Sequence, residues 1–257
     1  MSTRDSSAAI VVAGGTGTRF GSMKQFADFF GFPVIAWCVR ELLQVVGHIV
    51  IVLPEQVLAD TGEETILKTA CALSNCERLP EPADRYFAKS ANLCPEPEKA
   101  ITLTAGGETR SESVRNGLRA LPVNCSVVIV HDAARPLARA DLFRRVTEKI
   151  GEGYEGATCY LPVTDTVKFL EDDGSLSTLK RENLVAVQTP QAFSLSVLRK
   201  AHSGGRQATD DVALLEEVGA KIALVMGEPL NLKITDPGDI ILLEALLSAK
   251  KKPDEDA

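Results

Sequence analysis

A glycine-rich loop near the N-terminus of this chain has the residue types that bind polyphosphates. The loop consists of Ala13, Gly14, Gly15, Thr16, Gly17, Thr18 and Arg19. It directly follows a short apolar run, so its backbone N–H groups can turn toward phosphate oxygens. Arg19 and Lys24 add two cations, which suit a phosphoryl group that gains negative charge in a transition state. Without these cations the loop would equally fit a tight turn between a strand and a helix.

Two common phosphate-binding motifs are absent from this loop. A P-loop needs Gly-Lys-Ser/Thr after a fixed spacer, and the chain contains no such tripeptide. The dinucleotide fingerprint GxGxxG needs a third glycine where Phe20 follows Gly15 and Gly17. The loop therefore belongs to neither of these two classes.

Composition and charge restrict the partners of the protein. The chain has 257 residues, of which 45% are hydrophobic, and a formal net charge of -7. Such a chain lacks the dominant basic face that binding to nucleic acid or an anionic membrane requires. No apolar stretch approaches the roughly 18 residues that span a bilayer, and no secretory signal is evident, so we expect a cytoplasmic protein. The six cysteines form no CxxC pair, which favours reduced thiols over a zinc site.

Short β-branched runs alternate with amphipathic stretches along most of the chain. The expected strands lie at 9–13, 48–53, 100–104, 126–131, 157–162 and 221–226. The expected helices lie at 33–46, 110–121, 139–151, 194–202, 210–218 and 237–250. This alternation predicts an α/β fold, with a mostly parallel sheet, helices on both faces and ligands at the carboxyl ends of the strands.

Two segments interrupt the alternation within what we expect to be a single domain over 1–257. Residues 54–99 contain several prolines and no clear strand, which predicts a helix followed by an irregular insertion. Residues 163–187 predict a hairpin with Asp173 and Gly174 at its tip. Such a protruding β-arm has little core of its own. We therefore expect it to pack on a second subunit and the protein to be a homodimer.

A series of motifs follows in order along the chain. They are AGGTGTRF…KQF (13–26), GGETRSESVRNGL (106–118), VHDAARPL (130–137), LPVTDTVK (161–168), QTPQAF (188–193), TDDVALLE (209–216) and LNLKITDPGDI (230–240). Together they resemble the 2-C-methyl-D-erythritol 4-phosphate cytidylyltransferases, over roughly residues 9 to 247. The resemblance implies a Rossmann-like nucleotidyltransferase fold.

The resemblance also implies a binding site for CTP. Backbone groups for the base and phosphates would come from Ala13, Gly14 and Gly15. The catalytic cations would be Arg19, Lys24 and Lys233. Recognition of cytosine and ribose would involve Gly107, Glu108 and Ser113.

A metal site and an acceptor site follow from the same resemblance. Asp132 ends an expected strand and would bind the catalytic Mg²⁺; its alternative role is a structural carboxylate that caps the next turn. Asn231 is a further candidate ligand, because Leu230 stands where many members have aspartate. The acceptor, a sugar-alcohol phosphate, would contact Arg135, Thr166, Arg181 and Thr209. Thr166 and Arg181 lie on the expected arm, so they would reach the site of the neighbouring subunit.

The implied reaction transfers CMP from CTP to 2-C-methyl-D-erythritol 4-phosphate, releases pyrophosphate and serves isoprenoid precursor synthesis. The acceptor phosphate is already an anion near neutral pH, because its second pKa is about 6, so no general base is required. Two alternatives stay open: a similar enzyme that uses ribitol 5-phosphate, and a non-catalytic nucleotide-binding module. The sequence DAARPL favours the methylerythritol acceptor over ribitol 5-phosphate. The presence of Lys24, Asp132 and Lys233 argues against a non-catalytic nucleotide-binding module.

Overall fold

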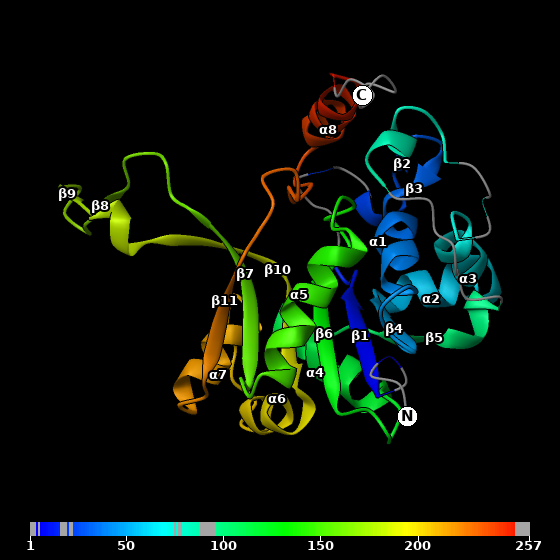
Figure 1. Cartoon of the computed structure of the whole chain (residues 1–257), viewed down its shortest axis with the longest axis horizontal. Coiled ribbons are helices and arrows are strands. Elements are labelled where there is room, and N and C mark those ends of the chain that lie inside the picture. The colour runs from blue at the N-terminus through cyan, green and yellow to red at the C-terminus, as the bar shows by residue number, and fades with distance from the viewer. Residues whose placement is uncertain are drawn as a thin grey trace, which may run out of the picture.

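A seven-stranded sheet forms the centre of the computed structural model, which describes residues 4, 6–15, 20, 23–74, 76, 79–87 and 96–249 (Figure 1). The strands are β1 (Ser7–Val12), β4 (His48–Leu53), β5 (Ile101–Ala105), β6 (Val127–Asp132), β7 (Gly156–Pro162), β10 (Val185–Ser194) and β11 (Ile222–Met226). Their order in the sheet is β11-β7-β10-β6-β1-β4-β5. All neighbours are parallel except those of β10, which runs antiparallel to β6 and β7. The predicted mostly parallel sheet is confirmed.

Strand β10 is the element of the sheet that the sequence did not predict. Pro190 lies inside it, and proline cannot donate a hydrogen bond to a sheet ladder, so its presence speaks against a strand. The structure accommodates the proline by an irregularity, because the pairing of β10 with β7 shifts in register between Gln188 and Gln191. The expected hairpin over 163–187 therefore ends in a strand that continues into the sheet.

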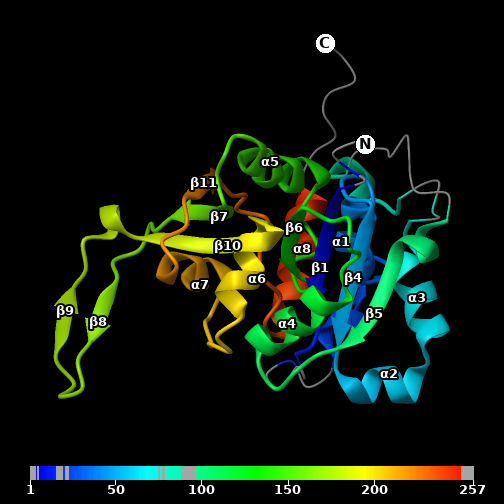
Figure 2. The same ribbon diagram turned by 90° about the horizontal axis from the view of Figure 1, so that it is seen from below.

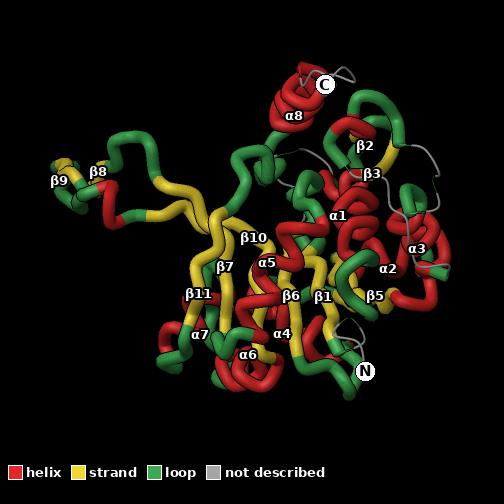
Figure 3. The backbone as a smooth tube through the Cα atoms, in the orientation of Figure 1, coloured by secondary structure: helices red, strands yellow, loops and turns green. Residues whose placement is uncertain are grey.

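Alternating side chains cover both faces of the sheet with apolar groups. Along β1, Ala9 and Val11 belong to one hydrophobic cluster, and Ala8 and Ile10 belong to the other. Helices pack on each face (Figures 2 and 3). The first face carries α1 (Val34–Leu42), α2 (Glu55–Thr61), α3 (Glu63–Cys71) and α5 (Ala140–Gly151). The opposite face carries α4 (Arg110–Ala120), α6 (Leu195–His202) and α7 (Asp211–Glu217).

A third hydrophobic cluster lies around Trp37 of α1, which is fully buried. It joins α8 (Pro237–Ala249) to the segment 79–87 through Leu243 and Phe87. Two short strands and two 3-10 turns complete this region: β2 (Asp28–Phe29), β3 (Phe32–Pro33), η1 (Lys24–Phe26) and η2 (Ala83–Arg85). A further 3-10 turn, η3 (Pro97–Ala100), contacts α3 and β5. The described part of 54–99 contains helices and 3-10 turns, without a strand. Among the described residues, no helix is long and apolar enough to cross a membrane.

The strands β7 and β10 lead out of the body into an arm (Figure 1). It contains β8 (Lys168–Leu170), β9 (Leu176–Thr178) and the turn η4 (Arg181–Asn183). At its tip Gly174 has φ of 83°, and the Ser175 amide donates to Asp173 Oδ1 at 2.9 Å, which confirms the predicted Asp-Gly turn. The arm is exposed on all sides within this chain: Phe169 and Leu170 are 53% and 67% accessible.

Helix α4 lies so close to the sheet that Gly117 has no room for a side chain. A Cβ atom there would lie 2.7 Å from Ile10 Cγ2 and 3.2 Å from Val52 Cγ2. We predict that Gly117→Ala lowers the free energy of unfolding by about 1–3 kcal/mol, measured by urea denaturation, because overpacking strains a dense core. The control is Gly151→Ala at the end of α5, where nothing lies within 4 Å of the added atom. That variant should be unchanged or up to about 1 kcal/mol more stable; equal stability of both variants would contradict the close packing.

Candidate active site

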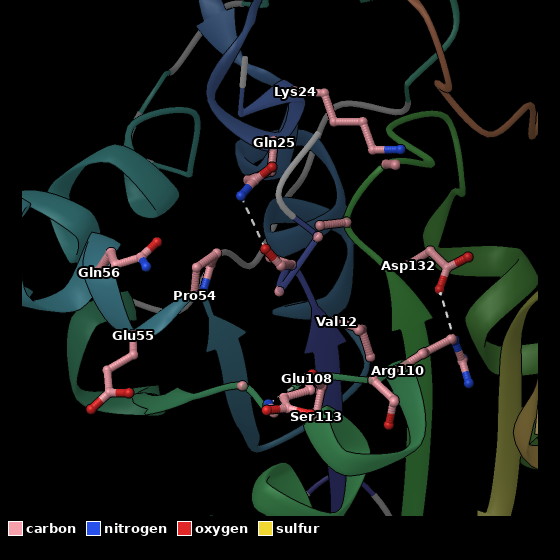
Figure 4. A pocket seen from close by; sticks show the side chains of 18 of the residues that line it. Val12, Lys24, Gln25, Pro54, Glu55, Gln56, Glu108, Arg110, Ser113 and Asp132 are labelled. Atoms are coloured by element: carbon pink, nitrogen blue, oxygen red, sulfur yellow. Dashed lines mark hydrogen bonds and ion pairs between the residues drawn. The ribbon is translucent and has the colours of Figure 1, made fainter. Parts of the chain in front are cut away.

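One cavity of about 660 Å³ lies at the carboxyl ends of neighbouring parallel strands (Figure 4). Strand β1 ends just before Ala13, β4 before Pro54 and β5 before Gly106, while β6 ends at Asp132 itself. In Figure 4, Lys24 lies at one end of the cavity and Glu108 and Ser113 at the other. This is the edge of a parallel sheet where ligands are expected.

The N-terminus of α4 lies close to Gly14, in the described part of the glycine-rich loop. Ser113 Oγ accepts a hydrogen bond from the Gly107 amide at 3.2 Å. A Cβ at Gly14 or Gly106 would lie 3.1 Å or 3.0 Å from the same oxygen, so close approach favours glycine at both positions. Thr109 and Glu112 form a capping box that starts the helix, whose N-terminus favours anions. The predicted nucleotide-binding residues that line the cavity are Ala13, Gly14, Gly15, Gly107, Glu108 and Ser113.

Asp132 is the electrostatic centre of the cavity wall. Its side chain is 9% exposed, and Oδ2 lies 2.8 Å from Lys233 Nζ. Oδ1 lies 3.5 Å from Arg110 Nε, and Oδ2 lies 3.9 Å from Arg135 Nε. Burial alone would raise the pKa of Asp132, but the charges of Arg110, Lys233 and Arg135 outweigh it and hold the pKa below its usual value. The carboxylate is therefore ionised at neutral pH.

Arg110 is the member of this cluster to which the sequence analysis gave no role. Its Nη1 donates to Asp211 Oδ2 at 2.7 Å, and Asp211 Oδ1 lies 3.0 Å from His202 Nε2. Arg110 lines the cavity, and its buried Nη2 has no hydrogen-bond partner among the described residues. A sequence signal did exist, because a cation in the first turn of a helix opposes the helix dipole.

Lys233 reaches Asp132 from the loop 227–235, which contains neither helix nor strand. Gln188 holds this loop, since its Nε2 donates to the carbonyl oxygens of Glu228 at 3.2 Å and Asn231 at 3.3 Å. Arg135 Nη1 donates to the Asn231 carbonyl at 2.7 Å. Side chains from the sheet and from the turn after β6 therefore determine where the lysine lies.

Lys24, which lies far from Lys233 in sequence, also lines the cavity. Its Nζ donates to the Ile234 carbonyl at 2.8 Å, directly beside Lys233. The side chain of the next residue, Gln25, donates to the Ala13 carbonyl at 3.0 Å and so joins this turn to the end of β1. Two of the three predicted catalytic cations, Lys24 and Lys233, thus line one cavity. The third, Arg19, lies outside the described residues.

Known proteins with similar sequences decide the family. A family model described as 2-C-methyl-D-erythritol 4-phosphate cytidylyltransferase matches residues 80–249. The 2-C-methyl-D-erythritol 4-phosphate cytidylyltransferase of Carboxydothermus hydrogenoformans is 39% identical over 247 residues, covering 93% of this chain and 94% of that protein. This chain belongs to that family.

Solved structures agree with this assignment. A crystal structure of 2-C-methyl-D-erythritol 4-phosphate cytidylyltransferase from Thermus thermophilus has a TM-score of 0.67 and 30% identity, covering 95% of this chain and 98% of that one. The 4-diphosphocytidyl-2C-methyl-D-erythritol synthase from Anaerococcus prevotii has a TM-score of 0.72 and 25% identity, with the same coverage. The resemblance to a cytidylyltransferase family and the predicted nucleotidyltransferase fold are confirmed.

The remaining predicted residues of this cytidylyltransferase-family chain do not line the cavity. Asn231 is fully buried, and its Nδ2 donates to the Thr189 carbonyl at 2.8 Å. Arg135 lies behind Asp132, and Thr209 is exposed just before α7. The other two, Thr166 and Arg181, are exposed on the arm, where Arg181 Nη1 donates to the Thr164 carbonyl at 2.6 Å. A single chain therefore does not bring the four predicted acceptor residues together.

Histidine is absent from the cavity wall of this family member, as far as the described residues define it. His131 is fully buried, and burial lowers its pKa to about 4, so its ring is neutral. Its Nε2 lies 3.2 Å from the Arg135 carbonyl. His202 contacts Asp211, and His48 lies beside Thr102 at the start of β4. This arrangement agrees with a reaction that requires no general base.

Proposed function

We propose that this protein transfers CMP from CTP to 2-C-methyl-D-erythritol 4-phosphate, releasing pyrophosphate and giving 4-diphosphocytidyl-2-C-methyl-D-erythritol. The observation that carries the proposal is the 2.8 Å pair of Asp132 and Lys233 in the cavity that Gly14, Gly15 and the N-terminus of α4 also line. Family membership supports the choice of substrates. The product would serve isoprenoid precursor synthesis in the cytoplasm.

The proposed reaction depends on alignment of the two substrates and on neutralisation of phosphate charge, and it needs no proton transfer. An oxygen of the acceptor phosphate bonds to the α-phosphorus of CTP, and the bond to the bridging oxygen breaks, so pyrophosphate leaves with that electron pair. Lys24 and Lys233 would bind phosphate oxygens and offset the charge that develops there. The cavity would also align two anions that repel each other in water.

One residue of the cavity, Asp132, has the oxygen atoms that a magnesium ion would bind. Asp132 lines the cavity as an ionised carboxylate, and Mg²⁺ typically binds one or two protein carboxylates together with substrate phosphates. We expect Asp132 to hold the ion, whose chemistry would be to neutralise charge on the phosphate oxygens. The buried Oδ1 of Asn231 has no described partner, but its side chain lies off the cavity, which argues against Asn231 as a second ligand.

The deciding experiment is pyrophosphate release by purified protein with Mg²⁺ and CTP. Methylerythritol phosphate and ribitol 5-phosphate are compared as acceptors at equal concentration. Preference for methylerythritol phosphate supports the proposal, whereas preference for ribitol 5-phosphate keeps the mechanism and replaces the acceptor. Binding of CTP without turnover on either acceptor would instead indicate a nucleotide-binding module.

Lys233→Ala should lower kcat on the order of 10²-fold or more, because it removes a preorganised cation from the reacting phosphates. Steady-state pyrophosphate release measures the effect, and circular dichroism checks that the fold is intact. Lys221→Ala is the matched control, because its ammonium packs 4.3 Å above the Tyr154 ring and does not line the cavity. Its kcat should match that of the parent protein. Substantial residual activity of Lys233→Ala would remove this lysine from the catalytic set.

We also propose a homodimer in which the arm of each subunit reaches the site of the other. Two exposed apolar surfaces support it. The first is the arm itself, on which Phe169, Leu170 and Leu176 are 53%, 67% and 63% accessible. The second is a row across three neighbouring strands, where Tyr160 pairs with both Val187 and Met226. The latter two are 41% and 49% accessible, and contiguous exposed apolar groups are typical of interfaces.

Arg181→Ala should raise the KM for the acceptor about 10-fold or more and leave the KM for CTP nearly unchanged, because Arg181 would bind the acceptor phosphate. The neighbouring arm residue supplies the control, Lys180→Ala, which should change neither KM. Light scattering should report a dimer for all three proteins. Equal changes in both KM values argue against an acceptor role, and a fully active monomer excludes the shared site.

A further inference from the structure

Glu228 fixes the loop 227–235, which carries Lys233, by ion pairs to two arginines. Its side chain is 16% exposed, and Oε1 lies 3.4 Å from Arg139 Nη2 and 3.2 Å from Arg145 Nη2. Its backbone carbonyl accepts from the Asn231 amide at 2.9 Å, which closes a turn two residues before Lys233. A movement of Glu228 would therefore move the segment from which the lysine projects.

A segment distant in sequence packs against this loop. Residues 79–87 contribute Tyr86 and Phe87 to the third hydrophobic cluster, in which they are 7% and 2% exposed. The same cluster contains the buried Ile234 and the partly buried Leu230 and Leu232, which alternate with Asn231 and Lys233 along the loop. The apolar residues of the loop thus belong to the same cluster as Tyr86 and Phe87, while Lys233 contacts Asp132.

Tyr86 joins the segment to Glu228 by a polar contact as well. Its hydroxyl lies within hydrogen-bonding distance of two acceptors, the Leu137 carbonyl at 3.0 Å and Glu228 Oε2 at 3.3 Å. Arg139 lies over the ring, with its guanidinium carbon 5.1 Å from the centroid. Burial and the nearby charge of Glu228 raise the pKa of Tyr86, so the hydroxyl remains a hydrogen-bond donor. The hydroxyl has one proton, so it bonds to one of these two oxygens at a time, and the bond to the carboxylate of Glu228 is the charge-assisted one.

We propose that Tyr86 is a positioning residue for the reaction, and that it holds Lys233 in place through Glu228. Residues 79–87 act as a clamp on the loop 227–235, so the ammonium of Lys233 meets the reacting phosphates without reorganisation. This rests on the proposed function only for the role of Lys233. The contact between Tyr86 and the loop stands independently of the substrate.

Tyr86→Phe tests the clamp, because it removes only the hydroxyl and keeps the buried ring. Tyr154→Phe is the matched control, since it makes the same chemical change on a ring that lies against Lys221. Hydrogen exchange with mass spectrometry is measured first, on peptides that cover 227–235. We expect exchange in this loop to become about 10-fold faster in Tyr86→Phe, with no change in Tyr154→Phe and none in the central sheet. Unchanged loop exchange in Tyr86→Phe overturns the clamp.

Kinetics then connect the clamp to Lys233. Tyr86→Phe should lower kcat about 5- to 10-fold, which lies within the range expected for the net contribution of one hydrogen bond, with less than about a 2-fold change in the KM for CTP. Glu228→Gln should lower kcat similarly, and the double variant should lose no more than either single one. In a Lys233→Ala background, Tyr86→Phe should have no further effect on the residual kcat. A full additional loss in that background overturns action through Lys233.

The two proposals fail in different ways. A parent protein that releases no pyrophosphate with either acceptor contradicts the proposed function, while faster loop exchange in Tyr86→Phe would still support the clamp. An active parent with Tyr86→Phe unchanged in both exchange and kcat contradicts the clamp alone. Loss of the folded state in Tyr86→Phe, seen by circular dichroism, moves the test to Glu228→Gln, whose loop exchange and kcat must then change as stated.

Discussion

The structure depends on one buried negative charge. Asp132 is ionised yet only 9% exposed, and an uncompensated carboxylate in such a place would cost several kcal/mol. Compensation comes from Arg110 at the start of α4, Arg135 in the turn after β6 and Lys233 in the loop before α8. Three segments far apart in sequence are thereby held around the end of one strand. The cavity is the space that their convergence leaves open.

The contact of Lys24 with the Ile234 carbonyl adds a fourth segment and spans 210 positions of the chain. Both lysines of the cavity therefore depend on the loop 227–235, one by projecting from it and one by binding its backbone. The cavity is complete only when the segment that contains Lys24 contacts the loop 227–235. A contact of such sequence separation carries a larger loop-closure entropy than a local one, so it needs the folded sheet and loops on both sides to hold it in place.

Local patterns in the sequence were enough to predict most of the fold and part of the site. The strand at 48–53 was predicted to the residue, because its periodicity and its flanking residues are both local signals. The sequence did not predict strand β10, because Pro190 lies inside it and proline is unfavourable in a strand. It gave no role to Arg110, because its partner Asp211 lies 101 residues away. The hairpin pattern placed Thr166 and Arg181 on the arm, and the structure confirms that position. Their acceptor role came from the resemblance alone and stays a prediction.

Strand β10 restricts insertions at the base of the arm to an even number of residues. Val185 and Val187 are exposed where the strand leaves the arm, and Gln188, which follows at once, is buried against the lysine loop. Side chains alternate with a period of two, and the sheet holds Gln188 and the residues after it, so one residue inserted between Val185 and Gln188 would reverse the faces of Val185 and the adjoining arm. Two inserted residues would restore the original faces. A redesigned arm can therefore change length freely at its tip, but near its base only in even steps.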